Sequence, residues 1–176
     1  MNSGHILLKL VLDEIGFGEI KIDSFIERKV LQKKIYLLQL TGIDLGYRSN
    51  WYLKGPYCPA LAGEVFSLRE EIKDGDDEFK DYELNSATKE KFQTLTEMAA
   101  LPEHLPTRED EWLELVASLH YLKHIAYWGG KANPDFEEVF QKLVNSKPHF
   151  KRKKDLAKAA WRRLDELGLI AKKTLR

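Results

Sequence analysis

Two histidines are the first candidates for chemistry. His120 and His124 lie four residues apart, and this spacing places two side chains on the same face of a helix. Paired imidazoles at this spacing bind zinc in some enzymes, where a Glu directly follows the first His. Here that position is Tyr121, and no third ligand is evident in the sequence. We therefore interpret both histidines as residues at the border of an apolar helix face.

The single cysteine is the second candidate. Cys58 directly precedes a predicted helix, and the N-terminus of a helix lowers the pKa of a thiol, which favours a nucleophile. No histidine lies near it in the sequence, so a basic partner would have to come from His104, His120 or His124 through the fold. We interpret Cys58 as a small residue at the entry of a helix.

Two other patterns resemble ligand-binding loops without completing them. The segment 129–131 reads Gly-Gly-Lys, but it lacks the earlier Gly and the following Ser or Thr of a phosphate-binding loop. Asp74, Asp76 and Glu78 alternate, but the long loop that ends in a calcium-binding Glu is missing. The sequence therefore predicts a non-enzymatic protein with no catalytic residue, no cofactor and no metal.

Charge is distributed unevenly along a chain whose formal net charge is zero. Residues 64–83 contain nine acids and three bases, whereas residues 147–176 contain eleven bases and three acids. A basic end suits a nucleic acid or an acidic partner. The candidate nucleic-acid-binding residues are Lys151, Arg152, Lys153, Lys154, Lys158, Arg162 and Arg163.

The order of elements at this basic end is that of a helix-turn-helix. A predicted helix over 134–145 is followed by a turn and a second helix over 152–167. The Gly-Leu-Ile step at 168–170 is similar to the exit of a winged-helix recognition helix into its wing. The alternative is a C-terminal helix that packs on the core and exposes its bases to solvent.

An aromatic stretch over residues 45–59 is the second candidate binding region. It contains three Tyr, one Trp, two Gly and two Pro, and aromatic side chains dominate both cores and interfaces. We expect the stretch mainly to organise the core while presenting part of its surface to a protein. The candidate protein-binding residues are Arg48, Trp51, Tyr52, Lys54 and Tyr57.

Apolar periodicity and capping residues predict the elements that position these groups. A capping box at Ser24 and Glu27 starts one helix, and Thr107 with Asp110 suggests a weaker one. Strand 51–53 is expected to pair with 44–47 through a turn at 48–50, and 82–84 is a further short strand. The predicted helices cover residues 4–15, 25–40, 59–72, 86–100, 108–127, 134–145 and 152–167.

These elements predict a mostly α (α+β) protein of about seven helices with a small β-hairpin, and a C-terminal winged-helix-like element as an option. The connector 101–106 contains two prolines and separates the halves 1–100 and 107–176. At 176 residues the halves are expected to form one compact domain.

Composition places the chain among soluble globular proteins. Apolar residues make up 43 % and charged residues 32 %. A lone cysteine excludes an internal disulfide and suits a reducing compartment. No apolar run approaches the roughly 18 residues of a membrane span, and the N-terminus does not have the pattern of a signal peptide. We expect a cytoplasmic protein without a membrane contact.

The run Leu31-Gln32-Lys33-Lys34-Ile35-Tyr36, followed by Leu45-Gly46-Tyr47-Arg48 and Trp51-Tyr52-Leu53-Lys54-Gly55-Pro56-Tyr57-Cys58-Pro59, resembles small prokaryotic proteins of the YwgA-like group. More distantly it is similar to the Panacea domain of SocA-like antitoxins. The resemblance covers about residues 28–68. It implies a mainly helical domain with a small hairpin and no known enzymatic activity. In the antitoxin relatives it implies neutralisation of a toxin by direct binding or by delivery to a protease.

The leading hypothesis is therefore a non-enzymatic protein-binding module, antitoxin-like or part of a prokaryotic defence or mobile-element system, which masks a partner's surface. The alternative is a winged-helix-like nucleic-acid-binding regulator that uses the basic C-terminal helix.

Overall fold

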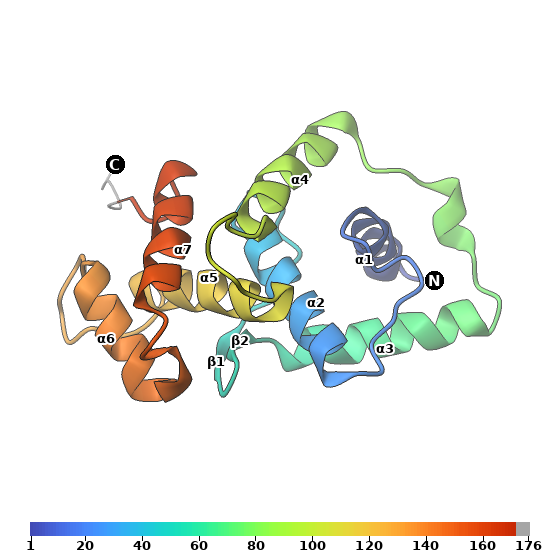
Figure 1. Cartoon of the computed structure of the whole chain (residues 1–176). Helices are drawn as coiled ribbons and strands as arrows, with labels where there is room; N and C mark the ends of the chain where they lie inside the picture. The colour runs from blue at the N-terminus through green and yellow to red at the C-terminus, as the bar shows by residue number, and fades with distance from the viewer. Residues whose placement is uncertain (172–176) are drawn as a thin grey trace.

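Seven α-helices, two short 3-10 helices and one two-stranded sheet form the part of the chain that the computed structural model describes, residues 1–171 (Figure 1). The prediction of a mostly helical fold with a small hairpin is confirmed. The elements are α1 (Ser3–Glu14), α2 (Phe25–Gln39), β1 (Asn50–Tyr52), β2 (Gly55–Tyr57), α3 (Pro59–Lys73), η1 (Glu78–Asp81), α4 (Ser86–Ala99), α5 (Glu109–His124), α6 (Phe136–Ser146), η2 (Pro148–Phe150) and α7 (Lys154–Glu166).

Helix α5 runs through the middle of the molecule and is buried on nearly every side. It packs against α2 and α4 from the N-terminal half, and against α6 and α7 from the C-terminal half. Figure 1 shows α5 between α2 and α7. Helices α1 and α3 lie on the opposite side of the molecule from α6 and α7. Trp112 is completely buried, and its indole N–H donates to the Met98 carbonyl at 2.9 Å. A helix buried all round is expected to be the core element of an all-helical fold.

The helix starts follow local capping chemistry. In the predicted capping box, the Glu27 N–H donates to Ser24 Oγ at 3.1 Å, and the Ser24 N–H donates to the Glu27 carboxylate at 2.8 Å. The predicted box at Thr107 is wrong, because α5 begins at Glu109 and the Thr107 hydroxyl instead donates to the Glu111 carboxylate at 3.0 Å. Helix α6 begins two residues later than predicted, behind a capping box on Asp135.

The hairpin pairs differently from the prediction. Strand β1 pairs antiparallel with β2, and Trp51 lies opposite Pro56 across a two-residue turn. Residues 44–47 are not a strand, because the Gln39 side chain takes up the backbone groups of Leu45 and Tyr47. Pro56 does not break the ladder, since each strand of a two-stranded sheet is an edge strand that tolerates a missing N–H.

Two further expectations concern the segments that follow η1 and α7. Residues 82–84 form no strand, and η1 precedes them. Helix α7 ends in a Schellman motif, in which Gly168 has a φ of +71° and the Leu169 N–H donates to the Leu164 carbonyl at 2.8 Å. No wing strand follows up to residue 171, and the rest of the expected wing lies outside the described residues, so a winged-helix element is not confirmed.

No helix within residues 1–171 is long and apolar enough to cross a membrane.

Candidate functional site

Two glutamines on one face of α2 hold the backbone of the aromatic stretch. The Gln32 amide donates to the Cys58 carbonyl and accepts from the Cys58 N–H, both at 2.9 Å. Seven residues later, the Gln39 amide donates to the Tyr47 carbonyl at 2.9 Å and accepts from the Tyr47 N–H at 3.0 Å. The two ends of the stretch are therefore fixed to the same helix.

Two buried lysines hold the hairpin between these ends. The Lys33 ammonium donates to the Pro56 carbonyl at 2.6 Å. On the other side, the Lys147 ammonium donates to the Tyr52 carbonyl at 3.3 Å and to the Leu53 carbonyl. Backbone carbonyls in the turn thus accept charge-assisted hydrogen bonds, which are stronger than neutral ones. The hairpin is a fixed element rather than a loose loop.

Trp51 of the hairpin faces the interior of the protein and contacts both α5 and Lys147. Its ring lies 5.5 Å from the ring of Tyr121 on α5, measured between centroids. The Lys147 ammonium lies 5.0 Å from the Trp51 ring centroid, within the range of a cation–π contact. Trp51 therefore anchors the hairpin to α5 and to Lys147, the residue between α6 and η2.

Buried carboxylates on α5 balance the lysines. Glu114, with a side chain only 2 % exposed, lies 2.5 Å from the Lys29 ammonium and 3.6 Å from that of Lys147. Lys29 also contacts Asp110 at 3.1 Å. Buried charges are tolerated only when they are paired in this way. Hydrogen bonds from Arg108, and then from Lys29, lower the pKa of Asp110 to about 2.

Lys33 is the least compensated member of this network. Burial lowers its pKa to about 7, and the neighbouring ammonium groups of Lys147 and Lys29 act in the same direction. Glu114 opposes these effects without cancelling them. Burial also lowers the pKa of Lys147, although less far. Because this pKa lies near neutral pH, a charged group that comes close to Lys33 would change the fraction of Lys33 that is protonated.

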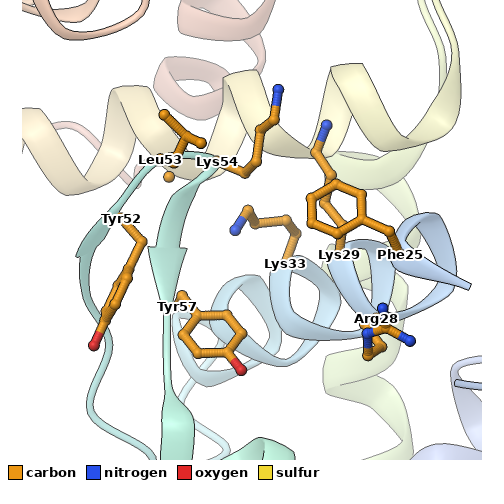
Figure 2. A pocket seen from close by; sticks show the side chains of 9 residues that line it. Phe25, Arg28, Lys29, Lys33, Tyr52, Leu53, Lys54 and Tyr57 are labelled. Carbon is orange, nitrogen blue, oxygen red and sulfur yellow. The ribbon is translucent and has the colours of Figure 1, made fainter.

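A pocket of about 310 Å³ opens between the hairpin and the first turns of α2 (Figure 2). Its lining is cationic and aromatic and includes no acidic residue. Figure 2 shows the Lys33 side chain extending from α2 towards the hairpin, with Tyr52 and Tyr57 on the strand side. We call this site the hairpin pocket, and its lining residues are Phe25, Arg28, Lys29, Lys33, Tyr52, Leu53, Lys54, Gly55 and Tyr57.

The rim of the hairpin pocket carries exposed apolar side chains. Leu53 at the turn is 81 % exposed, Phe25 56 % and Tyr52 45 %. The Tyr52 ring packs edge-on against Tyr57 with 5.2 Å between centroids, which sets its orientation. Apolar groups gathered at the mouth of a pocket are typical of binding surfaces.

The predicted protein-binding residues divide into three groups. Tyr52, Lys54 and Tyr57 line the hairpin pocket. Trp51 points inward instead, and Arg48 is exposed outside the pocket, 3.5 Å from Asp44.

Sequence reasoning missed the residues that α2 and the turn contribute, which are Phe25, Arg28, Lys29, Lys33 and Leu53. For the four residues on α2, the available signal was their spacing of three and four residues, which places them on one helix face. Leu53 lies in the hairpin turn and has no such signal.

The residues considered for chemistry have structural partners. The Tyr36 hydroxyl and His120 Nδ1 form a hydrogen bond of 2.7 Å, and His124 Nε2 hydrogen-bonds the Leu169 carbonyl at 2.9 Å. Cys58 is buried at the start of α3. Among residues 1–171 no group of three or more His, Cys, Asp or Glu side chains could hold a metal ion.

The predicted nucleic-acid-binding cations are only partly available. Lys153 pairs with Glu111, and Lys154 pairs with Glu137 at 2.7 Å. Arg163 donates to the Ala100 carbonyl at 2.9 Å, and its guanidinium lies over the buried Trp112 ring, 5.6 Å from the centroid. The remaining four, Lys151, Arg152, Lys158 and Arg162, are exposed.

Comparisons of the chain with protein-family models, with curated proteins and with solved structures found no match.

Proposed function

We propose that this protein is a non-enzymatic protein-binding module that masks an acidic surface of its partner with the hairpin pocket and its rim. The observation that carries the proposal is the combination of exposed apolar side chains and cations on a hairpin that α2 and Lys147 hold in place. The antitoxin-like role implied by the resemblance at residues 28–68 belongs to the same proposal.

Rigidity is the first physical argument for this function. A surface that is already ordered loses little conformational entropy when it binds, so more of its contact energy appears as affinity. The carbonyls of Tyr52, Leu53 and Pro56 are all hydrogen-bonded to buried lysines. These hydrogen bonds therefore hold the tip of the hairpin in place before a partner binds.

Complementarity is the second argument. Leu53 and Tyr52 offer apolar area that a partner can bury, and buried aromatic or apolar anchors dominate interface energies. Lys54 in the same turn and Arg28 on α2 belong to the lining of the same pocket and favour acidic surfaces, which affects specificity and association rate. The expected partner surface is an acidic rim around an apolar patch.

A pull-down with the tagged protein tests the proposal. The proteins that bind to the wild type are compared with those that bind to Leu53→Glu. Leu53 is highly exposed, so this change should alter stability by at most about 0.5 kcal/mol while adding a negative charge to the proposed interface. We expect a stoichiometric protein that binds the wild type and is lost with Leu53→Glu. The purified partner should then bind by calorimetry, and Lys158→Glu on α7 should bind it like the wild type.

Equal capture by wild type and Leu53→Glu would contradict the use of the hairpin, and a partner lost only with Lys158→Glu would move the interface to α7.

The exposed cations of the basic end support the second candidate function, a nucleic-acid-binding regulator. Lys151, Arg152, Lys158 and Arg162 remain exposed around the start and the outer face of α7. Phosphate contacts by such cations give binding that weakens steeply with salt. The double variant Lys158→Glu with Arg162→Glu should abolish that binding. Salt-independent or absent binding to DNA and RNA would remove this function.

A further inference from the structure

The size of the hairpin pocket limits what can enter it. Its volume of about 310 Å³ lies at the lower end of the roughly 300–1,000 Å³ of ligand sites in proteins. That space suits one side chain with an adjoining charged group rather than a folded element or a dinucleotide. Phe25, Tyr52 and Tyr57 give its walls aromatic surface.

The charges around the pocket do not balance within it. Lys29 is already paired with Asp110 and Glu114. In the part of the chain that the structure describes, Arg28 donates to two neutral carbonyls, those of Ile22 at 2.9 Å and Asp23 at 2.6 Å. Within residues 1–171 Lys54 forms no hydrogen bond or ion pair. Within residues 1–171, Arg28 and Lys54 are therefore two cationic residues of the lining that form no ion pair with a carboxylate.

The excess of positive charge extends to Lys33 at the floor of the pocket. Among the described residues, the one hydrogen-bond acceptor of its ammonium is the Pro56 carbonyl, at 2.6 Å. The charged and titratable groups around it come from α2, the hairpin, α5 and the segment entering η2: Arg28, Lys29, Lys54, Tyr52, Tyr57, Asp110, Glu114, Lys147 and His149. Cations outnumber carboxylates in this set, so a negative charge entering the pocket would be stabilised.

We infer that the hairpin pocket is a receptor for a carboxylate that lies beside an aromatic or aliphatic side chain of the protein partner. This inference rests on the proposed function and specifies the partner's chemistry. Arg28 and Lys54 would contact the carboxylate, and the apolar group would pack against Phe25, Tyr52 and Tyr57.

Binding should be linked to a proton on Lys33. Without a ligand the pKa of Lys33 lies at about 7 because of burial. An entering carboxylate opposes that effect and raises the pKa, so the pocket takes up a proton when it binds near neutral pH. By linkage, affinity should fall as the pH rises from about 6 to about 8.

The test uses N-acetylphenylalanine, which carries a terminal carboxylate, and its neutral amide as a matched pair. Amide chemical shifts of the labelled full chain report both the site and the affinity. We expect the acid to bind about tenfold more tightly than the amide, since one charge-assisted contact is worth about that factor. N-acetylaspartylphenylalanine amide, with its carboxylate on a side chain, shows whether the pocket prefers a side-chain or a terminal carboxylate.

Variants assign the effect to the pocket. Lys54→Met and Arg28→Met, at positions that are not fully buried, should each reduce the preference for the acid, whereas Lys158→Met on α7 should not. Equal binding of acid and amide, or shifts centred away from α2 and the hairpin, would overturn the inference.

The two proposals can also fail separately. A partner whose capture depends on Leu53, combined with no preference for the acid, would overturn only the carboxylate receptor. A clear preference for the acid without any captured partner would overturn the protein-binding function and leave a receptor for small carboxylates.

Discussion

Gly55 in the hairpin and Ser118 on α5 lie so close together that no side chain fits between them. A β-carbon on Gly55 would lie 2.6 Å from Ser118 Oγ and 3.5 Å from Lys33 Cε. Gly55 also has a φ of +88°, which favours glycine over all other residues. The close approach of β2 to α5 therefore requires glycine at this position for two separate reasons.

Gly55→Ala should lower the free energy of unfolding by about 2–5 kcal/mol. The positive φ accounts for roughly 1–2 kcal/mol and the overpacking against Ser118 for roughly 1–3 kcal/mol. Urea denaturation followed by circular dichroism measures the change.

Gly46→Ala is the matched control for this prediction. Gly46 has a comparable φ of +77°, but nothing lies within 4 Å of its hypothetical β-carbon. It should cost only the backbone strain of about 1–2 kcal/mol. If the two variants are equally stable, the contact with Ser118 does not constrain the hairpin.

Gln32→Met should destabilise the protein by about 2–4 kcal/mol. The change keeps the length of the side chain but removes both of its hydrogen bonds. The buried Cys58 N–H then loses its partner, whereas the Cys58 carbonyl keeps the Ala62 N–H as a donor. A buried N–H left unpaired costs about 1–3 kcal/mol, and the lost hydrogen bond to the carbonyl costs about 1 kcal/mol more. Thermal and urea denaturation both report the loss.

Gln93→Met on the exposed face of α4 controls for the chemistry of the substitution. Gln93 is exposed and donates to the Glu97 side chain at 3.2 Å, and surface changes of this kind stay within about 0.5 kcal/mol. A Gln32→Met variant as stable as Gln93→Met would show that water replaces the lost amide.

The sequence predicted the helices of this fold because their apolar period and capping residues are local. It failed at the hairpin, where pairing depends on Gln39, which removes residues 45 and 47 from the sheet, and on Lys147, about 95 positions away from the turn. Charge patterning along one segment does not reveal a contact that arises only when α2, α5 and η2 converge.

The candidate site was predicted only in part for the same reason. Tyr52, Lys54 and Tyr57 lie in one aromatic segment, so composition identified them. Lysine normally lies on the exposed polar side of a helix, so nothing local in the sequence indicates that Lys29 and Lys33 are buried. Their burial follows from Asp110 and Glu114 of α5, which provide the opposite charges that make it tolerable.

His5 predicts a pH dependence of stability at the other end of the molecule. Its ring lies 2.9 Å from Glu71 and 2.7 Å from Glu64, so both ring nitrogens face carboxylates. Burial lowers the pKa of His5, but the hydrogen bonds to Glu71 and Glu64 outweigh it, and the pKa rises above 6.5. The stabilisation is therefore fully present below about pH 6.5 and is lost as the pH rises through the raised pKa.

His5→Gln should remove this dependence. The stability difference between wild type and variant should be largest near pH 6 and should shrink as the pH rises above about 7. Urea denaturation across this range measures the difference, and an NMR titration of the His5 ring gives its pKa directly. A His5 midpoint below 6.5, or a difference that grows with pH, would contradict the bridge between α1 and α3.

Lys33 predicts the opposite slope. Its pKa is about 7 in the folded protein, against 10.5 for an unperturbed lysine. Between these values the unfolded chain holds a proton that the folded chain lacks, so the free energy of unfolding rises with pH. Lys33→Met has no proton to exchange, and its stability relative to wild type should therefore fall by about 1 kcal/mol per pH unit between about pH 7.5 and 9.

The comparison with Lys158→Met separates this effect from the general titration of lysines, because Lys158 is exposed on α7. Wild type and Lys158→Met should show parallel stability curves, while the curve of Lys33→Met diverges below them as the pH rises. Urea midpoints at several pH values measure all three proteins under the same conditions. Parallel curves for Lys33→Met would mean that the folded protein keeps Lys33 charged throughout this range. In that case Glu114 and the Pro56 carbonyl would stabilise the charged form of Lys33 at least as much as burial destabilises it.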